Sequence, residues 1–282
     1  IAPAMDLDMY KHPSTQKNLD LAESFGHIVI PAESGELASG LVGQGRMAEP
    51  ETITKTIVQF FNFNLKKNLE GKIVLITAGP TYEAIDPVRF IGNHSSGKMG
   101  YSLADEAARR GAKVILISGP SSEKVSEKNI EIHKVTSAKE MFDKVFEFYD
   151  TADIGIASAA VADYTPKMVA TEKIKKNDES FTIELIKNPD ILKTMGEKKK
   201  HQFLVGFALE TQNEEENAIG KLHKKNLDMI VLNSLRDAGA GFKNDTNKIK
   251  IFTPSEKKEF ELKSKDSVAI DILDFVENQY LK

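Results

Sequence analysis

Residues 77–100 read Thr77-Ala-Gly-Pro-Thr-Tyr-Glu-Ala-Ile-Asp-Pro-Val-Arg-Phe-Ile-Gly-Asn-His-Ser-Ser-Gly-Lys-Met-Gly100. They continue the short apolar run Lys72–Thr77, whose β-branched residues predict a buried strand. The loop is rich in Gly, Ser and Thr, and a helix is predicted to begin near Met99. Backbone N–H groups at a helix start can hold an anion, helped by the helix dipole. The segment therefore predicts either an anion-binding loop or an ordinary connection between a strand and a helix.

Four further apolar runs suit strands that are buried on both faces: Lys113–Ser118, Ile154–Ala159, Phe203–Ala208 and Met229–Leu232. Helical periodicity occupies the intervals, at Met99–Arg110, Met141–Tyr149, Glu214–Lys225 and Asp266–Asn278. Gly111 is predicted to end the first helix, and Ser137-Ala-Lys-Glu140 has the pattern of a capping box. Alternating strands and helices predict an α/β fold, Rossmann-like, with a mainly parallel sheet and helices on both faces.

The first 70 residues are predicted to form a separate small α/β fragment, followed by a second domain over residues 71–282. The pattern indicates a helix, a strand, a glycine-rich loop and a second helix, at Ser14–Phe25, His27–Ile30, Ser34–Arg46 and Glu51–Asn62. The polar segment Asn62–Glu70 is interpreted as the linker. The chain starts with Ile1 and lacks a leader pattern, so we expect it to be a fragment of a longer protein.

The charge, the apolar runs and the cysteine content indicate which classes of partner and compartment to expect. The 42 acidic and 38 basic residues give a net charge of −4, so nucleic acid is not an expected partner. No apolar run approaches the roughly 20 residues that a membrane-spanning helix needs, so no membrane partner is expected either. Cysteine is absent, which excludes disulfides and thiolate sites and is compatible with a reducing compartment. We therefore expect a cytoplasmic protein.

A P-loop must be weighed against the anion-binding loop, because residues 92–98 match the front of that motif. The residue after Lys98 should be Ser or Thr, but it is Met99. A P-loop also follows its strand at once, whereas about 15 residues intervene here. A Gly-x-Gly-x-x-Gly fingerprint for dinucleotides is missing after every predicted strand. Neither motif explains the loop.

Two other regions carry candidate site residues. The run Ile154–Pro166 is rich in alanine and ends near Asp163, whose carboxylate could bind a substrate or a metal. Helix packing explains the alanines equally well. Lys173-Ile-Lys-Lys176 fits either a solvated edge or a lysine that stabilises a polyphosphate. Lys221 and Lys225 share one helix face, which favours an anionic ligand or nearby carboxylates such as Glu214–Glu216.

These segments occur in an order that resembles a known family. Thr77–Gly100 is followed by Ala-Ala-Val-Ala-Asp-Tyr, Lys-Ile-Lys-Lys, Asn-Pro-Asp-Ile-Leu, Gly-Phe-Ala-x-Glu-Thr and Lys-Leu-x-x-Lys-Asn-Leu-Asp. The series resembles the phosphopantothenate–cysteine ligase domain of the bifunctional bacterial coenzyme A biosynthesis flavoprotein. The resemblance covers about Gly71 to the end of the chain.

The resemblance implies a two-step ligation in coenzyme A biosynthesis. The carboxylate of 4′-phosphopantothenate attacks CTP to give an acyl-cytidylate and pyrophosphate, and the cysteine amine then displaces CMP. CTP rather than ATP is implied by the fused bacterial arrangement, and Mg²⁺ is expected with the triphosphate, held mainly by phosphate oxygens and water. A non-catalytic nucleotide-binding subunit is the alternative, but it would need neither Lys173 nor Asn93.

By resemblance, Lys173 stabilises the phosphorus centre during activation. Asn93 holds the intermediate for amine attack, together with Ala159, Ala160 and Asp163. The implied nucleotide site consists of Gly79, Ser95, Gly97, Gly100, Ala157, Ser158, Ala159, Asp163, Lys173, Asn188, Pro189, Asp190, Ile191, Leu192, Phe207, Lys221 and Lys225. The resemblance further implies a homodimer, in which Arg89 reaches the neighbouring subunit's site. The alternative is that Arg89 pairs with Asp86 or Glu83 in its own loop.

The amino-terminal fragment resembles the end of the fused phosphopantothenoylcysteine decarboxylase, through which a higher oligomer could form. Pro3-Ala-Met-Asp-Leu-Asp-Met9 and Leu37-Ala-Ser-Gly-Leu-Val-Gly-Gln-Gly-Arg-Met47 carry this resemblance. The family pattern has Asn at Asp6 and a proton-donating Cys at Ser39, and a hydroxyl is a far weaker acid than a thiol. The flavin-binding body is not in this chain, so FMN is expected only with that body. FMN-dependent decarboxylation by the full-length parent is therefore the alternative function.

Overall fold

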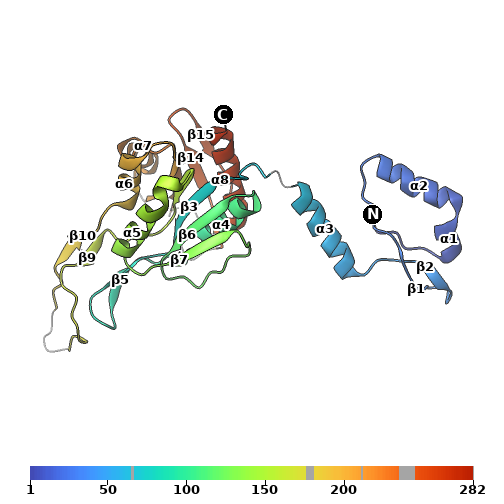
Figure 1. The fold of residues 1–282 in the computed structure, drawn as a ribbon, viewed down its shortest axis with the longest axis horizontal. Coiled ribbons are helices and arrows are strands. Elements are labelled where there is room, and N and C mark those ends of the chain that lie inside the picture. Colours follow the sequence, from blue (N-terminus) through green and yellow to red (C-terminus); the bar gives the residue numbers. More distant parts are fainter. Residues whose placement is uncertain (65–66, 176–180, 211, 235–244, 282) are drawn as a thin grey trace. The chain divides into compact units, whose positions relative to one another are not determined.

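The computed structural model describes residues 1–64, 67–175, 181–210, 212–234 and 245–281 (Figure 1). The chain divides into two compact units, Ile1–Lys66 and Lys67–Lys282. Each unit is described by itself.

The second unit is built on a sheet whose strands, from one edge to the other, are β7 (Ile130–Lys134), β6 (Lys113–Ser118), β3 (Ile73–Ala78), β8 (Ile154–Ala157), β11 (Phe203–Glu210), β12 (Met229–Ser234), β14 (Ile249–Phe252) and β15 (Lys257–Glu259). The first six strands are parallel, and β14 and β15 are antiparallel to their neighbours. The six parallel strands follow the 3-2-1-4-5-6 order of a doubly wound fold. The predicted α/β class with a mainly parallel sheet is confirmed.

Helices cover both faces of this sheet, as predicted (Figure 1). One face packs against α4 (Lys98–Arg109) and α8 (Lys265–Tyr280), and the other against α5 (Ala138–Phe148), α6 (Ile191–Lys198) and α7 (Glu214–Lys224). In β3, Val74 and Ile76 belong to the first core, while Leu75 between them belongs to the second. This alternation explains why the parallel strands read as continuous apolar runs.

Three two-stranded sheets accompany the main sheet: β4 (Tyr82–Ala84) with β5 (Phe90–Gly92), β9 (Tyr164–Pro166) with β10 (Leu185–Lys187), and β13 (Thr246–Asn247) with β16 (Lys263–Ser264). The first lies between β3 and α4, and the second follows β8 along the chain. Figure 1 shows that the β4–β5 hairpin and the described residues 167–175 and 181–184, next to β9 and β10, extend away from the main sheet. The predicted long loop before α4 thus contains a hairpin.

The predicted helix ends agree with the structure in their chemistry. Gly111 follows α4 with a φ of +94°, a left-handed conformation that glycine adopts without strain. Ser137 caps α5 by accepting from the Glu140 N–H, as a capping box requires. The Glu140 carboxylate, however, accepts from the N–H of Thr136 rather than from that of Ser137. The hydrogen bond back from Glu140 is therefore shifted by one residue, from Ser137 to Thr136.

The first unit contains α1 (Leu7–Lys11), α2 (Pro13–Ser24), the antiparallel pair β1 (Glu33–Glu36) and β2 (Val42–Arg46), and α3 (Pro50–Asn64). The prediction of a strand at His27–Ile30 is wrong. This segment accepts from the Ile1 amino group at the Ile28 carbonyl and donates from the Ile30 N–H to the Ile1 carbonyl, and these two bonds to one residue do not make a strand. The predicted loop Ser34–Arg46 is instead a hairpin, since its glycines occupy strand as well as turn positions.

The segment interpreted as a linker, Asn62–Glu70, is structured at both ends. Helix α3 continues to Asn64, and residues 65–66 lie outside the described part. Leu69 is fully buried in the core of the second unit, and Asn68 donates to Glu277 of α8 at 2.8 Å. Residues 67–70 therefore belong to the second unit by packing.

Candidate nucleotide and substrate site

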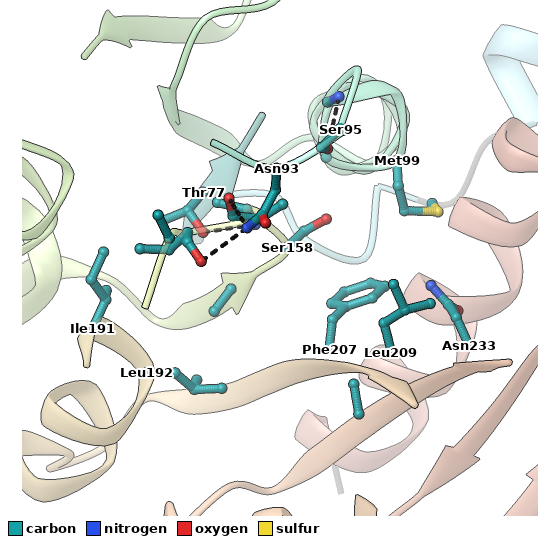
Figure 2. Close-up of a pocket in the computed structure, with 18 of the residues that line it drawn as sticks. Thr77, Asn93, Ser95, Met99, Ser158, Ile191, Leu192, Phe207, Leu209 and Asn233 are labelled. Carbon is teal, nitrogen blue, oxygen red and sulfur yellow. Dashed lines mark hydrogen bonds between the residues drawn. The ribbon is translucent and has the colours of Figure 1, made fainter. Parts of the chain in front are cut away.

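A pocket of about 460 Å³ lies at the carboxyl ends of β3, β8, β11 and β12 (Figure 2). In the chain, β3 is followed by β6 and β7, which extend the sheet toward one edge. The chain then returns to β8, which pairs with β3 on its other side. The strand order therefore reverses between β3 and β8. In doubly wound sheets, ligands bind in the crevice at this switch point.

The amino end of α4 forms one wall of the pocket. Gly97 precedes the helix with a φ of +87°, and an added Cβ would lie 3.2 Å from the backbone of Gly79. Ser95 and Ser96 accept hydrogen bonds from the N–H groups of Gly97 and Lys98, at 3.3 and 3.2 Å. The helix start is thus held tightly against the end of β3, where its N–H groups and dipole favour an anion.

Gly100 controls this close approach, because an added Cβ would lie 2.5 Å from the Cβ of Ala78. We predict that Gly100→Ala lowers the free energy of unfolding by about 1–3 kcal/mol, since overpacking outweighs the better helix propensity. Gly220 on α7 is a matched control with nothing within 4 Å, and Gly220→Ala should stabilise by up to about 1 kcal/mol. Urea denaturation measures both. A Gly100→Ala protein as stable as wild type would contradict the packing argument.

A second wall is the segment that follows β8. The Asn93 amide nitrogen donates to the carbonyl oxygens of Ala160 and Val161, at 3.1 and 3.2 Å (Figure 2). Thr77 binds the same segment from β3, since its carbonyl accepts from Ser158 N–H and its hydroxyl from Ala159 N–H. These contacts hold small side chains at the pocket, where a ligand can approach the backbone. Ala157, Ser158, Ala159, Ala160 and Asp163 all line it, as does Asn93.

The third wall comes from the start of α6 and from α7. Pro189, Ile191 and Leu192 line the pocket beside Asp190, which caps α6 by accepting from Lys193 N–H at 2.9 Å. Lys225 pairs with Asp190 at 2.9 Å. Burial would raise the pKa of Asp190, but the hydrogen bonds from Lys225 and the Lys193 N–H lower it below its usual range. Asp190 is therefore a carboxylate that holds Lys225 at the pocket.

Lys221 is placed in the same way, by an ion pair with Glu210 at the end of β11. The hypothesis that Glu214–Glu216 balance the two lysines needs correction, because Glu210 and Asp190 do so. Phe207 of β11 is partly buried and forms the floor of the pocket (Figure 2). The predicted Lys221, Lys225 and Phe207 thus meet at one site.

Three predicted site residues do not line this pocket. Gly79 packs behind it against Gly97 and Gly119. Arg89 and Lys173 are both exposed and lie outside it. Arg89 pairs with Asp86 in its own loop and keeps 42% of its side chain exposed. Lys176 of the predicted lysine run lies outside the described residues.

Arg89 and Lys173 are nevertheless tied to one another through Asp86. Arg89 Nη2 donates to the carbonyl of Ile174 at 2.8 Å, and the Ile174 N–H donates to Asp86 at 3.1 Å. Burial would raise the pKa of Asp86, but Arg89 and three backbone N–H groups lower it well below its usual range. The charged Asp86 therefore joins the β4–β5 hairpin to the segment that carries Lys173.

Several pocket residues were not predicted from the sequence: Thr77, Ser96, Lys98, Met99, Val161, Ala162, Ala208, Leu209, Asn233, Asn247 and Lys265. Asn233 could have been predicted, because it directly follows the predicted strand Met229–Leu232. Asp163 was proposed for a similar reason, since it lies shortly after the predicted strand Ile154–Ala159. Asn247 and Lys265 come from β13 and α8, after the last parallel strand. No rule about strand ends points to them.

The two residues singled out in the first unit lie at a helix start and in a hairpin turn. Asp6 caps α1 by accepting from Leu7 N–H at 2.7 Å. Ser39 is exposed in the turn between β1 and β2. Across the described ranges, no group of three or more His, Asp or Glu side chains could hold a metal ion. No helix that the structure describes is long and apolar enough to cross a membrane.

The second unit is by fold a doubly wound α/β domain with a pocket at its switch point. The family model described as DNA/pantothenate metabolism flavoprotein C-terminal domain matches residues 69–280. The chain belongs to this family. A second model, described as Flavoprotein, matches residues 1–62.

Similar proteins agree with this assignment. The coenzyme A biosynthesis bifunctional protein CoaBC of Bacillus subtilis (strain 168) is 50% identical over 274 residues, which cover 97% of this chain and 68% of that protein. A cysteine/cysteine sulfinic acid decarboxylase from an unknown prokaryotic organism is 52% identical over 277 residues, 97% of this chain and 77% of that protein. The crystal structure of the C-terminal domain of a CoaBC has a TM-score of 0.65 and 42% identity, and covers 76% of this chain and 97% of that one.

Proposed function

We propose that this chain joins 4′-phosphopantothenate to cysteine in coenzyme A biosynthesis, with CTP as the activating nucleotide. Membership of the pantothenate metabolism family and the similarity to CoaBC proteins support the ligation. The observation that carries the nucleotide assignment is the pocket itself. It combines the amino end of α4, small residues after β8 and two positioned lysines in one crevice.

The proposed reaction has two steps. A carboxylate oxygen of 4′-phosphopantothenate attacks the α-phosphorus of CTP, and the bond to the bridging oxygen breaks, so that pyrophosphate leaves. The cysteine amine then attacks the acyl carbon, CMP leaves, and the amine loses a proton. Both steps develop negative charge on phosphate oxygens, which nearby cations and N–H donors stabilise.

The residues divide between the two substrates. We propose that the starts of α4 and α6 bind the nucleotide through Ser95, Gly97, Gly100 and residues 189–192, together with Phe207 from the floor and Lys221 and Lys225 from the third wall. Gly79 acts by allowing the close approach of Gly97 rather than by touching the ligand. Asn93, Ala159, Ala160 and Asp163 hold the acyl group. Lys173 and Arg89 lie outside the crevice of their own chain. We propose that their positive charges stabilise negative charge on the substrates.

Mg²⁺ fits this pocket as part of the nucleotide. Asp163 and Asp190 line it, but Asp190 is already paired with Lys225. No carboxylate cluster in the described ranges supplies a full set of metal ligands. The ion would therefore be held mostly by phosphate oxygens and water, and would neutralise phosphate charge.

The direct test is pyrophosphate release from the chain incubated with 4′-phosphopantothenate, cysteine, Mg²⁺ and either CTP or ATP. We expect release that requires the acid substrate and is faster with CTP. Omitting 4′-phosphopantothenate is the control for simple hydrolysis. Equal turnover with ATP would contradict the choice of nucleotide alone, while no pyrophosphate with either would contradict the ligase.

A further inference from the structure

Lys265 occupies an unusual place for a lysine. It is the first residue of α8, only 5% of its surface is exposed, and it lines the pocket. Lys98, Asn233 and Asn247 also line the pocket. The Lys265 N–H donates to Asp245, which pairs with Lys98, and Asn233 lies opposite Ile249, two residues after Asn247. Figure 2 shows Asn233 beside Leu209, at the end of the pocket opposite Ile191. This end contains none of the residues proposed from the sequence for the acyl group.

The position is unfavourable for a cation in three respects. Burial removes the ammonium group from water, the amino end of a helix carries partial positive charge, and Lys98 is a like charge nearby. Burial and then Lys98 lower the pKa of Lys265, which Asp245 and Glu123 offset only in part. Lys98 has its own ion pair with Asp245 at 2.6 Å. Among the described residues, none makes a hydrogen bond or ion pair with the Lys265 ammonium group.

The groups around Lys265 are also incompletely paired. The Asn233 side-chain oxygen is buried and has no partner in the described ranges. The hydroxyl of Ser102 on α4 donates to Asp266 of α8 at 2.6 Å. This contact holds the amino ends of two helices together, so that both dipoles add at one end of the pocket.

We propose that Lys265, with Lys98 and Asn233, binds a phosphate group at this end of the pocket. A bound phosphate would balance the buried ammonium and accept hydrogen bonds from the amides. The inference rests on the proposed function in one respect, because both ligase substrates carry a phosphate that could enter. One source is the polyphosphate of the nucleotide, and the other is the phosphate of the acid substrate.

The test compares Lys265→Met with Lys263→Met. Lys263 lies two residues away, outside the pocket, and pairs with Asp271 at 2.7 Å, so both variants lose one positive charge. Calorimetry with inorganic pyrophosphate should show binding at least about tenfold weaker for Lys265→Met, and within about threefold of wild type for Lys263→Met. Lys265→Arg keeps the charge and should bind within about tenfold of wild type. If Lys265→Met binds pyrophosphate as well as wild type does, the inference is wrong.

Thermal unfolding without ligand provides an independent readout. Because Lys265→Met removes an unbalanced buried charge, its melting temperature should equal or exceed that of wild type. A clearly lower melting temperature would mean that the ammonium group has a structural partner, which contradicts the inference. Lys263→Met, which breaks an ion pair, should not raise it.

The two phosphate sources are separated by paired ligands. A loss for CTP that is absent for CMP assigns the site to the polyphosphate, and a loss for 4′-phosphopantothenate that is absent for pantothenate assigns it to the acid. An equal loss for all four ligands would overturn the inference. Wild-type protein that binds pyrophosphate through Lys265 but is inactive with CTP and ATP would reject the ligase only. An active ligase whose Lys265→Met variant binds normally would reject only this site.

Discussion

Lys173→Gln should reduce formation of the acyl-cytidylate by about 10²–10³-fold, roughly 3–4 kcal/mol, the usual loss when one donor to developing charge is removed. The α-phosphorus and the departing pyrophosphate gain negative charge during activation, and an amide cannot balance it. Lys173 is exposed and carries no ion pair in the described part of the chain, so its removal should leave folding unchanged.

Asn93→Asp should act on the other half-reaction. The Asn93 amide donates to two carbonyl oxygens of the segment after β8, and a carboxylate would instead repel them. In the proposed mechanism, attack on CTP does not need that amide, whereas the acyl group must be held in place while the amine approaches. The variant should therefore make the acyl-cytidylate and accumulate it.

Mass spectrometry of quenched reactions distinguishes the two variants. Lys175→Gln is the matched control for Lys173→Gln, because it removes another exposed lysine from the same segment. We expect it to retain activity within about threefold of wild type. Equal losses for both lysines would show a general charge effect, and a missing intermediate in Asn93→Asp would show that the role given to Asn93 is wrong.

The parallel core was predictable because its chemistry is local. Ile73–Ala78 and the neighbouring strands are continuous apolar runs because helices cover both of their faces. Gly111 was predictable as a helix end because its φ of +94° is a conformation that favours glycine. The hairpin at β1–β2 was missed because glycine is equally common in loops and at hairpin positions, and only pairing distinguishes them.

The residues themselves indicated the site only after strand ends, whereas Phe207, Lys221, Lys225 and residues 189–192 were predicted from the family resemblance. The small residues come directly after β8, and the helix start at Gly97 belongs to the next helix after β3, so topology brings them together at the ends of two neighbouring strands. The partners of Lys221 and Lys225 were not predictable, because Glu210 and Asp190 are distant in sequence from these lysines. Lys265 enters the pocket by the packing of α8 against α4, a tertiary contact that no local pattern contains.

The exposed pair of Arg89 and Lys173 leads to the second large effect. Neither residue lines the pocket of its own chain. Asp86 nevertheless links them, because it pairs with Arg89 and accepts from the N–H of Ile174, next to Lys173. Arg89 keeps 42% of its side chain exposed despite this ion pair. A guanidinium held rigidly at the surface suits a phosphate or carboxylate of another molecule. We propose that the ligase is a twofold dimer in which each chain supplies Arg89 and Lys173 to its partner's pocket.

Complementation tests this arrangement. Arg89→Ala and Asn93→Ala chains, each inactive alone, are mixed in equal amounts and allowed to exchange subunits. Half of the dimers are then mixed, and one of the two pockets in each has an intact Asn93 and receives an intact Arg89. Activity should therefore rise to about one quarter of that of wild type. If it stays at the level of the separate variants after exchange is verified, Arg89 acts within its own chain.

A third mixture decides whether Lys173 acts together with Arg89. In a mixture of Arg89→Ala and Lys173→Ala chains, every mixed dimer lacks one of the two groups at each pocket, provided that both groups come from the partner. Activity should then remain at the level of the separate variants, although Lys173→Ala mixed with Asn93→Ala should recover about one quarter. Recovery in the Arg89→Ala and Lys173→Ala mixture would instead mean that Lys173 serves the pocket of its own chain, and that the Ile174 contacts with Arg89 and Asp86 loosen when the substrates bind.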